Sequence, residues 1–218
     1  MSAPASVAGA AALAFTHRFV PATDPAAPPL LLLHGTGGDE NDLLPIGRML
    51  APGAALLSPR GKVSEGGMPR FFRRLAEGVF DEQDVVRRAN ELADFIAEAR
   101  AAYGLPAPVA VGFSNGANIA AALLMLRPEA LSGAILLRAM VPLAAPPAGT
   151  LPGTPVLILS GAADPIVPRG NAERLADELT RRGGQVEHKV LSGGHGLTPA
   201  DVAAARAWFQ ANTPRPAA

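Results

Sequence analysis

Short apolar segments bounded by turn-forming residues recur along the chain. They are nearly continuous rather than alternating in polarity, which is typical of parallel strands buried on both faces of a sheet. We predict strands of this kind at Leu30–Leu33, Ala54–Leu57, Val109–Phe113, Ala134–Leu137 and Val156–Leu159, and a further strand at Val186–Leu191. Phe15–Val20 is expected to form an antiparallel edge strand.

Helical patterns lie between these segments. The clearest is Glu82–Tyr103, in which Val85, Ala89, Leu92 and Ile96 fall near one stripe. Further helices are predicted at Leu43–Leu50, Asn115–Leu126, Asn171–Arg182 and Pro199–Gln210. This alternation of strands and helices predicts an α/β fold, with a mostly parallel sheet, right-handed crossovers and helices on both faces.

The length and composition favour a single folded domain. The chain has 218 residues, of which 49% are hydrophobic and 17% charged, and this size suits one buried core. We place the domain at residues 15–211, with flexible tails at 1–14 and 212–218. The first tail lacks the Lys or Arg of a secretory signal, and no apolar run approaches the roughly 20 residues that span a bilayer. We therefore expect a cytoplasmic protein without membrane insertion.

The charge balance and the absence of cysteine exclude several classes of chemistry. Lys plus Arg and Asp plus Glu both number 19, so the chain lacks the field that attracts nucleic acid, and no nucleic-acid partner is expected. With no cysteine, disulfides, thiolate catalysis and zinc–thiolate sites are ruled out. A homodimer is left open.

A serine stands between glycines where a strand meets a helix. Gly112-Phe113-Ser114-Asn115-Gly116 follows the apolar residues 109–111 and opens the helix predicted at 115–126. A nucleophile elbow needs this setting, because the two glycines allow strand and helix to approach closely around a strained turn. The alternative is an ordinary tight turn, and the strand–turn–helix context favours a nucleophile.

A serine nucleophile requires a base and a group that orients the base. His17 and His188 lie in strand patterns and are interpreted as surface residues, and His34 comes just before Gly35. This leaves His195, in a glycine-rich loop before the last helix, as the base. Asp164 lies in the segment Ser160–Pro168 directly after an apolar strand, where doubly wound sheets place their chemistry. The order Ser114, Asp164, His195 is that of α/β-hydrolases, although Asp before Pro is also a common turn former.

Acyl transfer also needs donors that bind the oxygen that becomes negative. These are usually the amide after the nucleophile and one from the loop after an early strand, which here are the amides of Asn115 and Thr36. Thr36 lies in His34-Gly35-Thr36-Gly37-Gly38. This loop lacks the spacing of a phosphate-binding motif, so nucleotide binding is not expected.

Together these motifs resemble the phospholipase/carboxylesterase family of α/β-hydrolases, which includes bacterial carboxylesterases and acyl-protein thioesterases. The resemblance covers roughly residues 30–209 and also rests on Met140-Val141-Pro142 and Gly194-His195-Gly196. It implies Ser114, Asp164 and His195 as catalytic triad, Thr36 and Asn115 as oxyanion hole, and hydrolysis of esters or thioesters without cofactor or metal.

One departure from the family pattern bears on the substrate. Asn115-Gly116 stands where the depalmitoylating thioesterases usually carry Gln-Gly, which argues against lipidated proteins. Residues 68–85 are closer to a bacterial branch near the hydroquinone-associated carboxylesterases. Arg138-Ala139 also differs from the pattern of that branch, with no assigned effect.

Two segments interrupt the alternation and are the places where we expect substrate contacts. They are the long irregular segment 61–80 and the Pro-rich connection 144–155, for which plain surface loops are the alternative. We predict that the apolar lining of the substrate pocket is formed by Phe71, Phe72, Met140, Val141, Ile166 and Leu197. The alternative for each of these residues is a position in the hydrophobic core. Arg70 or Arg73 is a candidate for binding a substrate carboxylate, with a solvated basic face as the alternative.

The sequence therefore predicts a serine carboxylesterase that acts on small to medium carboxylic esters. Thioesterase or lysophospholipase activity on longer acyl chains is the alternative within enzymes. A non-catalytic binding protein on a hydrolase scaffold is the alternative outside them, because a fold alone does not establish chemistry.

Overall fold

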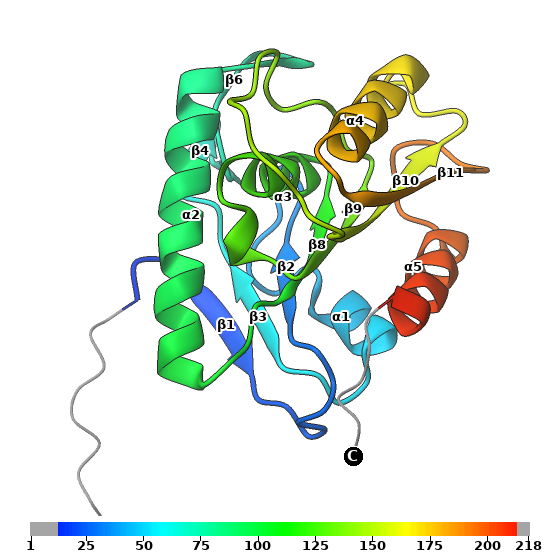
Figure 1. Ribbon diagram of the computed structural model, residues 1–218. Coiled ribbons are helices and arrows are strands. Elements are labelled where there is room, and N and C mark those ends of the chain that lie inside the picture. Colours follow the sequence, from blue (N-terminus) through cyan, green and yellow to red (C-terminus); the bar gives the residue numbers. More distant parts are fainter. Residues whose placement is uncertain (1–12, 213–218) are drawn as a thin grey trace, which may run out of the picture.

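The computed structural model describes residues 13–212, and within this range seven strands form the central sheet (Figure 1). Their order across the sheet is β1-β3-β2-β8-β9-β10-β11. All neighbouring pairs are parallel except β1 and β3, which are antiparallel at the edge. The strands are β1 (His17–Val20), β2 (Leu30–Leu33), β3 (Leu56–Pro59), β8 (Val109–Phe113), β9 (Gly133–Leu137), β10 (Pro155–Gly161) and β11 (Gln185–Leu191).

Helices cover both faces of this sheet (Figure 1). The helices are α1 (Leu44–Leu50), α2 (Glu82–Tyr103), α3 (Asn115–Leu126), α4 (Arg169–Arg181) and α5 (Pro199–Asn212), with a short 3₁₀ helix at Pro128–Ala130. Successive strand residues point to opposite faces, so Leu31 and Leu33 join a core with α2, α3 and α4, whereas Leu30 and Leu32 join a core with α1 and α5. The predicted α/β fold is confirmed.

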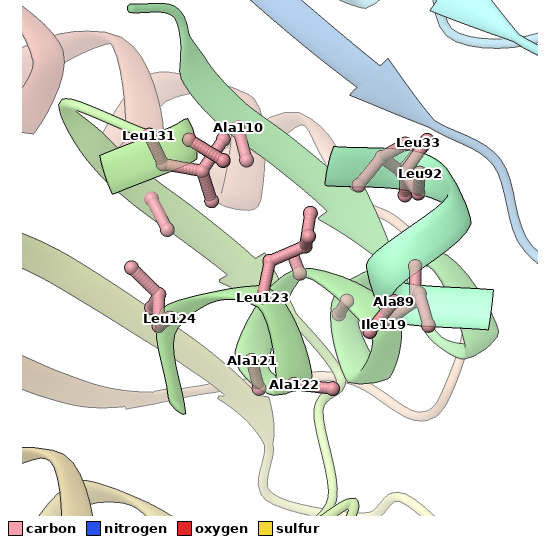
Figure 2. Packing of buried hydrophobic residues seen from close by; sticks show 14 of the residues in the cluster. Leu33, Ala89, Leu92, Ala110, Ile119, Ala121, Ala122, Leu123, Leu124 and Leu131 are labelled. Carbon is pink, nitrogen blue, oxygen red and sulfur yellow. The ribbon is translucent and has the colours of Figure 1, made fainter. Parts of the chain in front are cut away.

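The larger core is built around α3. Every residue of this helix from 115 to 125 is buried, and Figure 2 shows Ile119 and Leu123 among side chains from α2 and the sheet, including Leu33, Leu92 and Ala110. The small alanines of α3 let the helix lie close to the strands, which allows the elbow at its first turn to be tight.

Helix α2 has the predicted bounds and clear end signals. The Asp81 carboxylate accepts a hydrogen bond from the Asp84 amide at 3.1 Å, which caps the first turn. Gly104 ends the helix in the left-handed conformation, with φ of 67°. The predicted stripe is buried in the larger core, in which α2 packs on α3.

The segment 61–80, which was expected to be irregular, contains two hairpins. They pair β4 (Val63–Glu65) with β5 (Met68–Arg70), and β6 (Arg74–Ala76) with β7 (Val79–Phe80). Both turns use glycines with positive φ, namely Gly66 and Gly67 in the first and Gly78 in the second. The strands are only two or three residues long, too short for a clear alternation of polarity.

The predicted tails lie largely outside the described residues. Leu13, at the start of that range, packs against the larger core, and Asn212 ends α5. None of the helices within residues 13–212 has the length and apolar character needed to cross a membrane.

Candidate active site

Functional groups gather where the parallel strands end. Thr36 follows β2, Ser114 follows β8, Arg138 follows β9, Asp164 follows β10 and His195 follows β11. Because parallel strands end at the same edge of a sheet, residues far apart in the chain meet there.

Ser114 occupies a strained turn between β8 and α3. Its φ of 51° and ψ of −113° lie in a region that side chains rarely adopt. A Cβ on Gly112 would lie 2.5 Å from the Gly116 carbonyl oxygen, and one on Gly116 would overlap the carbonyl oxygen of Leu33. Both glycines are therefore required by the close approach of backbone to backbone.

His195 bridges the serine and the aspartate. Its Nε2 lies 2.9 Å from Ser114 Oγ, and its Nδ1 lies 2.9 Å from Asp164 Oδ2. With Asp164 ionised, Nδ1 donates to the carboxylate, which leaves Nε2 free to accept the hydroxyl proton of Ser114. The ring also packs against Phe113, with 5.5 Å between centroids.

Asp164 is held ionised by its own turn. Burial opposes its ionisation, but the amides of Ile166 and Val167 donate to Oδ1 at 2.8 and 3.1 Å. Together with the bond from His195, they outweigh burial and lower the pKa of this carboxyl below its usual value. The Asp164 carboxylate is thus a fixed negative charge beside the imidazole.

Arg138 supports the loop that carries His195. This fully buried guanidinium donates to the carbonyl oxygens of Gly194 at 2.9 Å and Gly196 at 3.3 Å, on either side of the histidine. It also forms two 2.8 Å bonds to the carboxylate of Asp201, in the first turn of α5. One side chain therefore joins the end of β9 to the histidine loop and to α5.

The two residues predicted to form the oxyanion hole, Thr36 and Asn115, line the same cavity as Ser114. Asn115 begins α3, so its N–H has no partner within the helix, and among the residues described no backbone bond outside helices and strands uses the Thr36 or Asn115 N–H. The β5 hairpin fixes both loops, because Pro69 O accepts from the Gly37 amide at 3.0 Å and Asn115 Oδ1 accepts from the Phe71 amide at 2.7 Å.

A cavity of about 250 Å³ opens beside Ser114 and His195. Of the predicted apolar lining, Met140 and Ile166 face it, and Val141 lines a neighbouring cavity of about 550 Å³ that shares Gly78 and Phe80 with the first.

The structure corrects the other three predicted lining residues. Phe71 and Phe72 are buried in the larger core, where Phe71 packs on the ring of His34 and Phe72 on Phe80. Leu197 lines a separate apolar groove beside α1 and α5. For an apolar residue beside a functional loop, the sequence does not show whether the side chain lies in the core or lines a cavity.

The structure gives the other three histidines structural environments. His17 and His188, which were interpreted as surface residues, are half-buried and bond Tyr103 and Ser160 at 2.7 and 3.0 Å. His34 is buried, with Nε2 accepting from the Gly61 amide at 3.0 Å and Nδ1 donating to Gly35 O at 2.7 Å. Burial lowers the pKa of His34, which favours its neutral form.

The sequence reasoning missed two kinds of residue at this site. Arg138 was noted only as a departure from the family pattern, although a lone arginine directly after a buried apolar strand signals a buried charge that needs a partner. Arg74 and Phe80 line the cavity from the second hairpin, and a segment expected to be irregular gave no register from which to place them.

Fold and site together define an α/β-hydrolase with a Ser–His–Asp arrangement at the carboxyl edge of its sheet. A family model described as phospholipase/carboxylesterase matches residues 16–213. The chain therefore belongs to the phospholipase/carboxylesterase family, which confirms the resemblance seen in the sequence.

Individual relatives agree with this assignment. MhqD of Bacillus subtilis (strain 168), whose name describes it as a hydrolase, is 48% identical over 183 residues, covering 83% of this chain and 92% of that protein. The crystal structure of the Bacillus cereus carboxylesterase matches with a TM-score of 0.90 and 43% identity, over 92% of this chain and 96% of that one. A structure of YahD with malic acid matches with a TM-score of 0.86 and 30% identity, over 91% and 100% of the two chains.

Proposed function

We propose that this protein is a serine carboxylesterase that hydrolyses small to medium carboxylic esters through an acyl-enzyme on Ser114. The observation that carries the proposal is the continuous hydrogen-bonded series Ser114–His195–Asp164, with both distances 2.9 Å. Such a series makes a hydroxyl nucleophilic near neutral pH. Membership of a family that contains carboxylesterases supports the ester as substrate.

In the first half of the reaction, Ser114 Oγ forms a bond to the ester carbonyl carbon while its proton passes to His195 Nε2. The carbonyl oxygen becomes an oxyanion, which the amides of Thr36 and Asn115 stabilise. The bond to the alcohol oxygen then breaks, and the leaving alcohol takes the proton from His195. Asp164 stabilises the imidazolium throughout.

In the second half, water attacks the acyl-enzyme and gives a proton to His195 Nε2. The acyl–Ser114 bond breaks, the acid is released and the proton returns to Ser114 Oγ. The cavity of about 250 Å³ favours short acyl or alcohol groups. A small substrate is also in keeping with YahD, a relative whose structure was determined with malic acid.

Labelling with a fluorophosphonate tests the proposal, because only an activated serine reacts. We expect labelling and p-nitrophenyl acetate hydrolysis in the wild type, and a loss of about 10⁴- to 10⁶-fold in turnover for Ser114→Ala. Ser132→Ala, which alters an exposed serine at the opposite end of the sheet, is the matched control and keeps full activity.

The same measurements separate the alternatives. A wild-type protein that is never labelled and hydrolyses no ester would be a binding protein on a hydrolase scaffold. A series of p-nitrophenyl esters with increasing acyl length is expected to show a maximum at short chains. A maximum at long chains, with faster turnover of acyl thioesters, would instead favour the thioesterase or lysophospholipase alternative.

A further inference from the structure

Two guanidinium groups line the cavity beside the nucleophile. Arg70 lies at the end of β5 and Arg74 at the start of β6, so both hairpins contribute a cation to one wall. The side chain of Arg70 is only 3% exposed, and that of Arg74 is 29% exposed. A buried cation beside a functional site requires a partner or a ligand.

The hydrogen bonds of Arg70 account for only part of its donors. Nε donates to Phe72 O at 3.2 Å, and Nη1 donates to Thr36 Oγ1 at 2.8 Å and contacts the Glu65 carboxylate at 3.2 Å. Nη2 forms no hydrogen bond with any residue in the described range 13–212. Burial, which removes this guanidinium from water, lowers its pKa.

Among the described residues, the two arginines at this wall have only one carboxylate as an ion-pair partner. Glu65 is shared, because its other oxygen accepts from Arg74 at 2.9 Å. One carboxylate therefore serves two guanidiniums. Of the other charged residues that line the cavity, Arg138 is paired with Asp201, and Glu77 is exposed.

Asn115, which also lines this cavity, has a buried donor without a partner in the described part of the chain. The Oδ1 atom of Asn115 accepts from the Phe71 amide, but its buried Nδ2 has no acceptor among the residues described. The positive end of α3 lies at the same residue. The wall thus combines two guanidiniums that share one carboxylate with Arg70 Nη2 donors that have no acceptor among residues 13–212, which is an arrangement that suits an anion.

The structure also separates the two arginines that the sequence left as alternatives. Arg73 is 65% exposed, is paired with Asp81 and does not line the cavity. Arg70, at the end of β5, lines the cavity instead, and Arg73 lies in the connection between the two hairpins.

We infer that Arg70 and Arg74 form a carboxylate subsite, and that the preferred substrates are esters that carry a free carboxylate, such as half-esters of short dicarboxylic acids. This inference rests on the proposed esterase function. The Nη2 donors of Arg70 bind the carboxylate, and Arg74 adds the second positive charge. The small cavity places that carboxylate only a few bonds from the scissile carbonyl.

A matched pair of substrates tests the subsite. Monoethyl succinate and ethyl succinamate have the same size and differ only in a carboxylate against a neutral carboxamide, and titration at constant pH follows hydrolysis of both. We expect kcat/KM for the anionic ester to exceed that for the amide by about ten- to a hundredfold, as for charge-assisted hydrogen bonds.

Three variants test which arginine causes the preference for the anionic ester. Arg70→Gln is expected to abolish most of the preference through a higher KM for monoethyl succinate, and Arg74→Gln to reduce it, which keeps the test decisive should the first variant not fold. Arg73→Gln, the neighbouring exposed arginine, is the control and retains the wild-type ratio.

Equal kcat/KM values for the two esters in the wild type would overturn the inference. So would an Arg70→Gln variant that loses activity equally on both esters, because the arginine would then act only by supporting the Thr36 loop. A protein that hydrolyses neither of these esters nor p-nitrophenyl acetate, and is not labelled by fluorophosphonate, would overturn the esterase proposal itself.

Discussion

At the scale of the residue, the geometry of the nucleophile depends on two neighbouring glycines, which have no side chain. Ser114 has a strained backbone, and such strain persists only where the surroundings determine it. Gly112 and Gly116 provide this by letting β8, α3 and the end of β2 touch through their backbones. The two glycines thus fix the backbone turn that positions the Ser114 side chain.

Gly116→Ala is expected to lower both stability and activity. The added Cβ would overlap the carbonyl oxygen of Leu33, a backbone atom in a central strand that has no rotamer to change. We expect a loss of about 3 kcal/mol or more in the free energy of unfolding, measured by urea unfolding, together with loss of fluorophosphonate labelling.

Gly170→Ala is the matched control for this substitution. Gly170 lies in the first turn of α4, and an added Cβ there meets no atom within 4 Å. Alanine also has the higher helix propensity, so this variant is expected to be as stable as the wild type or slightly more so. Equal stability of both variants would show that the close approach at Gly116 is not required.

At the scale of the element, the loop that carries His195 is held in place by contacts with elements that are distant in the sequence. Arg138 ends one strand, Asp201 lies in the last helix, and the loop between Leu191 and Pro199 is bonded to both. Bonds from Arg138 and Thr198 lower the pKa of Asp201 below its usual value, against the effect of burial. The ion pair is therefore charged at neutral pH.

Arg138→Met is expected to destabilise the protein by about 3–5 kcal/mol, because it leaves the buried Asp201 carboxylate without its partner. Urea unfolding measures this loss. The double variant Arg138→Met with Asp201→Leu removes both charges and is expected to recover most of the stability.

Activity separates the two effects of the ion pair. Because the guanidinium also bonds Gly194 and Gly196, the double variant is expected to remain impaired in kcat although it is stable. Full activity in the stable double variant would contradict a positioning effect on His195.

The elements themselves were predictable where they are long or continuously apolar. The bounds of β2, β8, α2 and α3 agree with the sequence pattern, whereas β3 begins two residues later than predicted. The hairpins at 63–80 were not predictable, since their short strands pair only under the constraint of glycine turns and of contacts such as that between Pro69 and Gly37.

At the scale of the whole molecule, stability is expected to depend on pH through His34. Its folded pKa lies below the ordinary value of 6.5, so between these two values the unfolded chain binds more protons than the folded one. The free energy of unfolding then rises with pH, is fully established above about 6.5 and falls as the pH drops through the folded pKa.

The comparison of wild type with His34→Gln isolates this contribution. Urea unfolding at pH 5.0, 6.0 and 7.5 is expected to show a steeper loss of stability toward acid in the wild type than in the variant, whose side chain does not titrate. Parallel curves for the two proteins would show that His34 does not contribute to the pH dependence.

The sequence by itself determined the order along the chain of the helices and of the strands of the central sheet, the turn around Ser114, and the set of residues that includes Asp164 and His195. These features follow from local patterns, because burial on both faces of a strand, a helix stripe and a glycine-flanked turn are each encoded by neighbouring residues.

Only the tertiary structure decided which side chains face the cavity. Phe71 and Phe72 lie in the core, Arg70 and Arg74 face the site, and Arg138 supports the histidine loop. The physical reason is that a shift of one residue in the register of a short hairpin moves each side chain to the opposite face of the hairpin. Here the register is set by contacts between the hairpins and the loops at the strand ends, and these segments meet only in the folded chain.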